Sequence, residues 1–259
     1  MINLKQEAKN RKINGVLVKV SAHPAMVLMA KSAGMDFIFY DCEHGALSYE
    51  KLHDMMVLGN AEGIPSVVRV PQLARADVSK ILDYGARGVM VPMIESKEDA
   101  QKLAAWSKYP PVGRRSYSGG ANTHYGPSGN HENNMREMNR STITIAQVET
   151  VTGVEHIDEI LSVEGIDAVI IGPCDLGISM GNPDNVMDSR ELALIRKTAQ
   201  ACRRFDKAFG IIGGMELIRY FREEIDIIVT AIDTNLLRDG LKRTVEECRK
   251  LTEEQEDLI

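Results

Sequence analysis

Polar residues stand at the ends of four short apolar runs in this sequence, and their types are those used in acid–base and metal chemistry. Run by run, they are Asp41, Glu43 and His44; Arg69; Gln147 and Glu149; and Cys174 and Asp175. If the runs are parallel strands of one barrel, their carboxyl ends meet on one rim and these side chains converge there. The sequence therefore predicts one site that combines a histidine, an arginine and several carboxylates.

Glu149 and Asp175 are expected at the ends of adjacent strands, where both carboxylates could face one point. Mg²⁺ or Mn²⁺ typically takes one or two protein carboxylates and leaves its other positions to water and substrate oxygens. The alternative is that each carboxylate caps the helix that follows it, because acidic residues are favoured at helix N-termini. The residues alone leave both interpretations open.

His44 follows Asp41 and Glu43, and a neighbouring carboxylate would raise its basicity, as a general base requires. The alternative is a turn histidine bonded to the backbone. Arg69, in an otherwise apolar strand, must find an anion, either a substrate carboxylate or enolate or one of the rim acids. Lys19 also interrupts an apolar run. A Schiff base is conceivable there, but we favour a lysine that reaches solvent or an ion pair.

The elements that must position these residues follow from eight β-branched or apolar runs, at 16–20, 37–40, 67–70, 89–91, 142–148, 168–171, 208–212 and 227–232. Their starts are about 30 residues apart, the size of one strand-plus-helix unit. Helical patterns open after Ser48, Ser96 and Ser189. No GxGxxG follows the first run and no linker divides the chain, so we expect one domain, residues 1–259, folded as a (β/α)₈ TIM barrel.

Two segments stand outside this pattern. Residues 109–134 have the composition of a long loop, and the charged tail after Lys242 is typical of a surface or exchanged helix. Because the loop follows the fourth strand, we expect it on the same face as the rim residues, where Arg115 would contact the distal end of a bound molecule and favour a polar or anionic group there. The alternative is a solvated loop or a subunit contact.

The charge and hydropathy of the chain limit the kinds of partner that we expect. There are 31 Lys and Arg residues against 37 Asp and Glu, a net charge of −6, which disfavours nucleic acid. No apolar run approaches the roughly 18 residues of a spanning helix, and the N-terminus lacks a signal-peptide core. We therefore expect a cytoplasmic protein that binds neither nucleic acid nor a membrane. The four cysteines form no CxxC pair, so reduced thiols are expected.

A set of motifs resembles one enzyme family in order and spacing. These motifs are Asp41-Cys42-Glu43-His44-Gly45, Val68-Arg69-Val70-Pro71, Leu82-Asp83-Tyr84-Gly85-Ala86, Gly88-Val89-Met90-Val91-Pro92, Gln147-Val148-Glu149 and Gly172-Pro173-Cys174-Asp175-Leu176. Together they resemble the HpcH/HpaI aldolase family, of the 4-hydroxy-2-oxoheptanedioate aldolase type. The resemblance implies a class II aldolase that uses a divalent metal (Mg²⁺, Mn²⁺ or Co²⁺) to cleave 4-hydroxy-2-oxoacids, among them 2-keto-3-deoxy acids, reversibly into pyruvate and an aldehyde.

The resemblance also implies roles for individual residues. Glu149 and Asp175 would bind the metal, His44 would be the acid/base, and Arg69 would stabilise the pyruvate enolate. Gln147 and the Cys174 amide would contact substrate.

It further implies that Asp83 supports the basicity of the histidine. Asp83 precedes the fourth strand, so it should lie at the far end of its own barrel, and a neighbouring subunit would supply it. A homo-oligomer, often a hexamer with an exchanged C-terminal helix, is implied as well. The alternatives are an acyl-CoA lyase of the citrate lyase β type and a catalytically silent protein that binds a 2-oxoacid.

Overall fold

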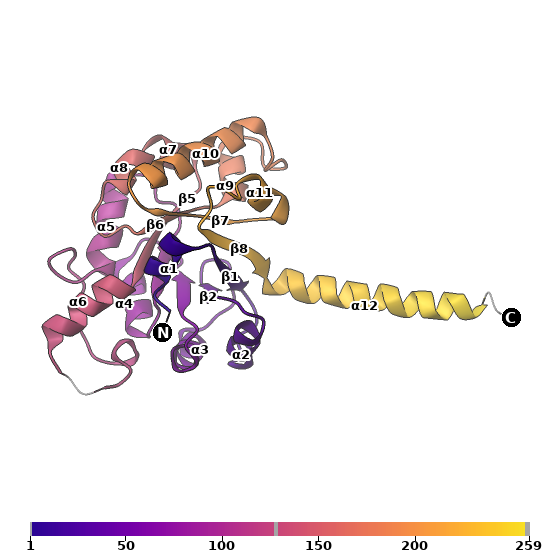
Figure 1. Cartoon of the computed structure of the whole chain (residues 1–259), viewed down its shortest axis with the longest axis horizontal. Coiled ribbons are helices and arrows are strands. Elements are labelled where there is room, and N and C mark those ends of the chain that lie inside the picture. Colours follow the sequence, from indigo (N-terminus) through magenta and orange to yellow (C-terminus); the bar gives the residue numbers. More distant parts are fainter. Residues whose placement is uncertain (1, 127–128, 257–259) are drawn as a thin grey trace.

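The computed structural model describes residues 2–126 and 129–256, and it contains a closed barrel of parallel strands (Figure 1). The ring runs in sequence order through β1 (Ile13–Val18), β2 (Phe37–Asp41), β3 (Ser66–Arg69), β4 (Gly88–Val91), β5 (Ile143–Val148), β6 (Ala168–Ile171), β7 (Ala208–Ile212) and β8 (Ile227–Ile232). β1 pairs with β2 on one side and with β8 on the other, which closes the ring. The prediction of a (β/α)₈ barrel is confirmed.

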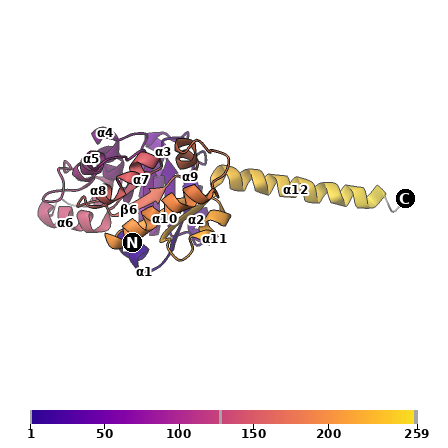
Figure 2. The ribbon, with the colours of Figure 1, turned by 90° about the horizontal axis from the view of Figure 1, so that it is seen from above.

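Helices surround the ring (Figure 2). In the described part of the chain they are α1 (Leu4–Asn10), α2 (Ala25–Ser32), α3 (Tyr49–Glu62), α4 (Arg75–Asp83), α5 (Lys97–Ser107), the 3₁₀ turn η1 (Ala121–Thr123), α6 (His131–Ser141), α7 (Val151–Glu155), α8 (Ile157–Leu161), α9 (Pro173–Ser179), α10 (Ser189–Arg204), α11 (Met215–Tyr220) and α12 (Asp233–Glu256). None of the described helices is long and apolar enough to cross a membrane.

The strands are apolar on both faces because each face meets a separate core. Ile38 and Tyr40 belong to the large cluster between the strands and the helices, whereas Phe37 and Phe39 belong to the cluster that fills the barrel. This alternation follows from the two-residue repeat of a strand. Leu4 of α1 belongs to the inner cluster, so α1 closes the amino-terminal end of the barrel. The chemistry is left to the opposite, carboxyl end.

Helix starts agree with the sequence at two of three places. The hydroxyl oxygens of Ser48 and Ser96 accept hydrogen bonds from backbone amides of the first turns of α3 and α5. The prediction that Ser189 is the cap of the third helix was wrong by one residue, because α10 already begins at Ser189. Asp188 caps α10 and accepts from the Arg190 amide at 2.8 Å, because an aspartate oxygen is an equally good acceptor at this position.

The long loop is shorter and differently placed than predicted. Asn130 caps α6, so the last predicted loop residues are helical. The loop also lies at the amino-terminal end of the barrel, because α5 carries the chain back from β4 before the loop begins. Lys108, directly after α5, donates to the Thr142 carbonyl oxygen at 2.7 Å, just ahead of β5. Positions 127 and 128 lie outside the described residues.

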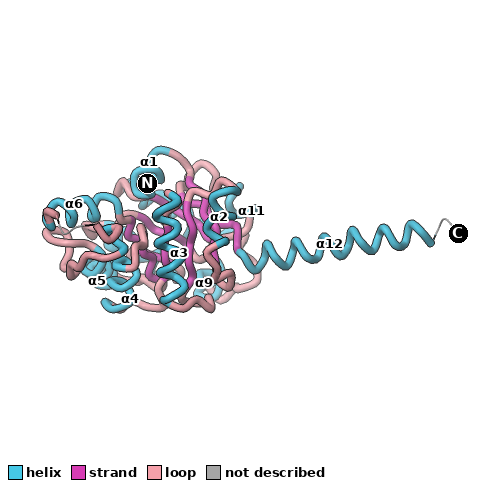
Figure 3. Tube along the Cα trace, turned by 90° about the horizontal axis from the view of Figure 1, so that it is seen from below, coloured by secondary structure: helices cyan, strands magenta, loops and turns pink. Residues whose placement is uncertain are grey.

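The C-terminal helix also begins earlier than predicted, at Asp233 rather than after Lys242. It leaves the barrel beside β8 and extends far from it, as Figures 1 and 3 show in different views. Five of its apolar side chains are about half exposed or more, namely Leu236, Leu237, Leu241, Val245 and Leu251.

Candidate active site

A cavity of about 360 Å³ opens at the carboxyl end of the barrel strands. Its polar lining comprises Lys19, His44, Arg69, Gln147, Cys174, Asp175, Thr230 and Asn235, and Leu17, Ile212 and Ile232 are among its apolar residues. Most of the residues expected on the rim therefore meet here. Glu149 lies directly behind the wall, since a Cβ atom on Gly172 would be 2.4 Å from Glu149 Oε2.

Arg69 is held by a two-pronged ion pair with Asp41. Arg69 Nε donates to Asp41 Oδ1 at 2.9 Å and Nη2 donates to Oδ2 at 2.7 Å, and Asp41 is fully buried. Burial alone would raise the pKa of Asp41, but the hydrogen bonds and charge of Arg69 lower it below its ordinary value. The rim-acid alternative for Arg69 is thus confirmed, and Asp41 positions this arginine within the cavity wall.

The remaining guanidinium nitrogen of Arg69, Nη1, has two further acceptors. Nη1 donates to Gln147 Oε1 at 3.3 Å and lies 3.1 Å from Glu43 Oε2. Gln147 in turn donates through Nε2 to Glu149 Oε2. A continuous polar chain therefore joins Asp41, Arg69, Gln147 and Glu149.

Glu149 is a buried carboxylate with a strongly raised pKa. It is 2% exposed and accepts from the Met93 amide at 2.9 Å. Burial, with the nearby acids Asp175 and Glu43, raises the pKa of Glu149 to about 7, although the Met93 amide and Arg69 act in the other direction. Such a carboxylate lacks enough positive charge around it, which is the property expected of a cation ligand.

The alternative that each acid stabilises the start of the next helix applies to Asp175 but not to Glu149. Thr150, not Glu149, caps α7, since its hydroxyl accepts from the Gly153 amide at 3.1 Å. Asp175 lies in the first turn of α9 and also lines the cavity, so helix stabilisation and ligand binding are compatible there. Within residues 2–126 and 129–256, no group of three or more His, Cys, Asp and Glu side chains is placed to hold a metal. Two carboxylates are the donor set that suits Mg²⁺, which keeps several waters.

His44 stands at the mouth, with 55% of its side chain exposed. Its Nε2 lies 3.7 Å from Glu43 Oε2, and its backbone amide donates to Asp41 Oδ1 at 3.2 Å. The carboxylate beside the ring is therefore Glu43, while Asp41 fixes the turn. Gly45 is required there, because a Cβ atom would lie 2.1 Å from the Asp41 carbonyl oxygen.

Asp83 and Arg115 lie at the opposite end of the barrel and do not reach the cavity of their own chain. Arg115 Nη2 donates to Asp83 Oδ1 at 2.7 Å, and the guanidinium carbon lies 4.7 Å from the centre of the Tyr109 ring. The far-end position expected for Asp83 is confirmed. The expectation that Arg115 is on the catalytic face of this barrel was wrong, because α5 separates β4 from the loop.

One positioning residue was missed in the sequence. Asp233, directly after β8, is buried and accepts from the amides of Lys19, Val20 and Ser21 at 3.1, 3.0 and 2.8 Å. Burial alone would raise the pKa of Asp233, but these amides lower it below its ordinary value. The rule applied to the other strands, a polar residue just past an apolar run, could have found it.

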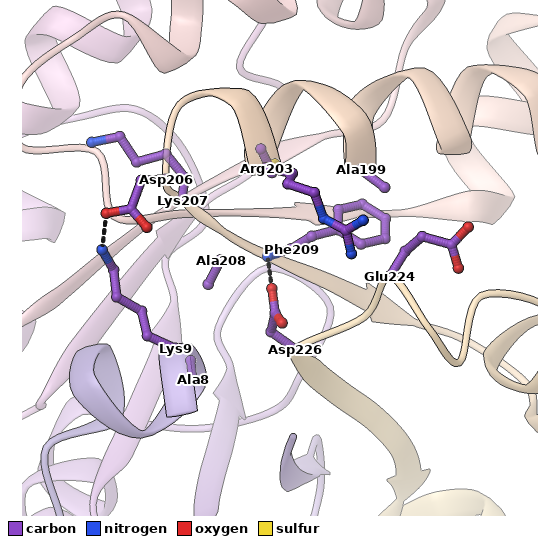
Figure 4. A pocket seen from close by; sticks show the side chains of 11 residues that line it. Ala8, Lys9, Ala199, Arg203, Asp206, Lys207, Ala208, Phe209, Glu224 and Asp226 are labelled. Atoms are coloured by element: carbon purple, nitrogen blue, oxygen red, sulfur yellow. Dashed lines mark hydrogen bonds and ion pairs between the residues drawn. The ribbon is translucent and has the colours of Figure 1, made fainter. Parts of the chain in front are cut away.

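A second cavity, of about 180 Å³, lies among α1, α10 and β7 and is shown in Figure 4. Its charged residues largely satisfy one another or the backbone. Lys9 pairs with Asp206, and Asp226 accepts from the Phe209 amide at 2.9 Å. Because this cavity lies at the amino-terminal end of β7, it is not the place where a barrel of this kind carries its chemistry.

Comparisons with known proteins identify the family of the chain. The family model described as HpcH/HpaI aldolase/citrate lyase matches residues 16–235. The 2-keto-3-deoxy-L-rhamnonate aldolases of Shigella sonnei (strain Ss046) and Escherichia coli (strain K12) are each 32% identical over 187 residues, which cover 72% of this chain and 70% of each relative.

Two solved structures share the fold over nearly the whole chain. The HpcH/HpaI aldolase from Desulfitobacterium hafniense DCB-2 has a TM-score of 0.91 at 28% identity, covering 96% of this chain and 97% of that one. Citrate synthase SbnG has a TM-score of 0.87 at 25% identity, covering 98% and 100%. The chain therefore belongs to the HpcH/HpaI aldolase/citrate lyase family and is a carbon–carbon lyase.

Proposed function

We propose that this protein catalyses the divalent-metal-dependent, reversible cleavage of 4-hydroxy-2-oxoacids into pyruvate and an aldehyde. One observation carries the proposal: Arg69, Gln147, Asp175 and His44 line a single cavity, with the buried Glu149 directly behind its wall. Relatives named 2-keto-3-deoxy-L-rhamnonate aldolase support the substrate class, because a 2-keto-3-deoxy acid is a 2-oxoacid of this kind.

Glu149 and Asp175 would hold the metal, Mg²⁺, Mn²⁺ or Co²⁺. Both are oxygen donors. Burial, and after it the acids Asp175 and Glu43, raises the pKa of Glu149, and a bound cation would oppose these effects by stabilising the ionised carboxylate. When bound, a divalent cation supplies Lewis-acid polarisation of the substrate's oxygens. Gln147 links Glu149 to Arg69 and lines the cavity, so its side chain would lie beside the substrate.

Arg69 would stabilise the negative charge that develops on the substrate's 2-oxo oxygen as the carbon–carbon bond breaks. Its guanidinium is already oriented by Asp41, so little reorganisation is needed during the reaction. The Cys174 amide, at the start of α9, would donate to the substrate carboxylate. His44 would take the proton from the 4-hydroxyl and later return a proton to C3 of the enolate, directly or through water.

We also propose that the protein acts as a homo-oligomer, of which a hexamer is the expected form. The exposed apolar side chains of α12 are the support within this chain, because an isolated helix gains most of its stability by packing an apolar face. A neighbouring copy would bring its Asp83 toward His44, and the Arg115 beside it would reach the substrate only by the same route.

Exchange of the pyruvate C3 protons with D₂O, followed by ¹H NMR, tests the activity without knowledge of the aldehyde. We expect exchange that a chelator abolishes and Mn²⁺ or Mg²⁺ restores. Asp175→Ala should lose it, whereas Asp184→Ala, at an exposed position away from the cavity, should retain it. Undiminished exchange in metal-free buffer would contradict the proposal, and release of acetyl-CoA from an acyl-CoA substrate without pyruvate exchange would favour the acyl-CoA lyase.

A further inference from the structure

Lys19 brings a second cation into the cavity, one that the mechanism above does not use. It directly follows β1, and its side chain is 30% exposed. The neighbouring part of the lining, Thr230, Ile232 and Asn235, comes from β8 and the start of α12 and contains no acidic residue. The one ion pair of Lys19 in the described part of the chain is with Asp41, as the ion-pair interpretation of the sequence expects, and Asp41 belongs to β2.

The nearest carboxylate to Lys19 is already engaged elsewhere. Lys19 Nζ lies 3.8 Å from Asp41 Oδ2, which is beyond hydrogen-bond distance. Asp41 accepts both prongs of Arg69 as well as the amides of Glu43 and His44. Nζ of Lys19 makes no hydrogen bond to any residue that the structure describes. Its three N–H groups are available to a ligand in the cavity.

The backbone of Lys19 is fixed on both sides, so this cation is positioned before any ligand arrives. Its amide donates to Asp233 at 3.1 Å, and its carbonyl oxygen accepts from the Ala46 amide at 2.8 Å. A binding group held in this way loses less conformational freedom on binding than one on a mobile loop.

Lys19 follows the strand that stands opposite the strand before Glu149. In a closed ring of strands in sequence order, β1 stands opposite β5, and Glu149 directly follows β5. The side chain of Lys19 reaches Asp41 Oδ2, which also accepts from Arg69. A substrate whose 2-oxoacid end lies beside Glu149 and Asp175 and which extends past Arg69 therefore meets Lys19.

We propose that Lys19 is a specificity-determining residue that binds an anionic group, a carboxylate, on the aldehyde half of the substrate. The inference rests on the proposed function and narrows it to 4-hydroxy-2-oxoacids with a second carboxylate. A charged hydrogen bond of this kind corresponds to about 10- to 100-fold in kcat/KM.

Two acceptor aldehydes of equal carbon count test this specificity. Glyoxylate carries a carboxylate where glycolaldehyde carries a hydroxymethyl group. We expect Lys19→Met to lower the kcat/KM ratio of glyoxylate to glycolaldehyde about 10- to 100-fold, and Lys19→Arg to retain most of it. Lys102→Met is the matched control, because Lys102 is an exposed lysine on α5 paired with Glu98.

A binding measurement separates this inference from the proposed reaction. Calorimetry should show that Lys19→Met weakens binding of 2-oxoglutarate relative to 2-oxopentanoate, which has the same chain length and no second carboxylate. An equal loss for both ligands or both aldehydes would overturn the role of Lys19. Borohydride trapping of pyruvate on Lys19 would also overturn it, in favour of a Schiff base. Absence of pyruvate exchange in the unaltered protein, with the binding preference intact, would count against the proposed reaction alone.

Discussion

Replacing Glu149 with glutamine should change how the metal-free protein responds to pH. The pKa of Glu149 is raised from 4.5 to about 7, mainly by burial. Between these values the unfolded chain has released the proton while the folded protein keeps it, so the unfolded state binds fewer protons and stability falls as pH rises. At 1.36 kcal/mol per pKa unit, the cost of the ionised carboxylate approaches about 3 kcal/mol above pH 7.

The measurement is the free energy of unfolding by urea, in chelator, at several pH values from 4 to 8 and at one protein concentration. Glu149→Gln loses one hydrogen bond to Gln147 or Met93, which shifts its stability by an amount that does not depend on pH. The difference between unaltered protein and variant should nevertheless fall by about 3 kcal/mol across this range. Glu155→Gln, at an exposed position on α7, is the matched control and should show no comparable change.

Metal provides the second half of this prediction. At pH 8, Mg²⁺ or Mn²⁺ should stabilise the unaltered protein more than Glu149→Gln, because a ligand that binds only the folded state raises its stability by mass action. A stability difference that stays flat between pH 4 and 8 would refute the account of Glu149 as an undercompensated acid. Equal stabilisation of both proteins by metal would remove Glu149 from the proposed ligand pair.

Three further outcomes are expected. His44→Ala should slow pyruvate proton exchange by about 100-fold or more, yet bind 2-oxopentanoate normally by calorimetry, and near-normal exchange would exclude this histidine as the acid/base. Lys108→Met should lower the free energy of unfolding by about 3 to 5 kcal/mol in urea titrations, because it leaves the buried Asp167 without its 2.6 Å partner; a loss below 1 kcal/mol would show that Lys5 compensates. Leu241→Asp combined with Val245→Asp should reduce the oligomer in sedimentation, and an unchanged assembly would place the interface elsewhere than α12.

The sequence by itself determined the barrel and most of the rim. Eight apolar runs at a spacing of one strand-plus-helix unit leave few alternatives to a closed parallel ring, and each rim residue is identified by its place after a run. Ser48 and Ser96 marked helix starts because N-capping is a local interaction between a hydroxyl group and the next turn.

Tertiary structure decided what each rim residue faces. The sequence left Arg69 between a substrate anion and a rim acid, and only the fold brings Asp41 and Arg69, 28 positions apart, into a buried two-pronged pair. The raised pKa of Glu149 likewise depends on burial and on two acids from other units of the barrel, Asp175 in α9 and Glu43 in the turn after β2.

The position of Arg115 was also decided by the tertiary structure. Its loop follows β4 in the sequence, but the direction of α5 sends it to the far end of the barrel, against Asp83. The sequence shows Lys19 as a charged residue in an apolar run. Only the fold shows that Asp41 bonds Arg69 rather than Lys19, and that Asp233 accepts a hydrogen bond from the Lys19 amide. Local patterns fix which elements form, because their interactions span a few residues. The partners of a charged side chain are set by groups distant in the chain, so they emerge only when the barrel closes.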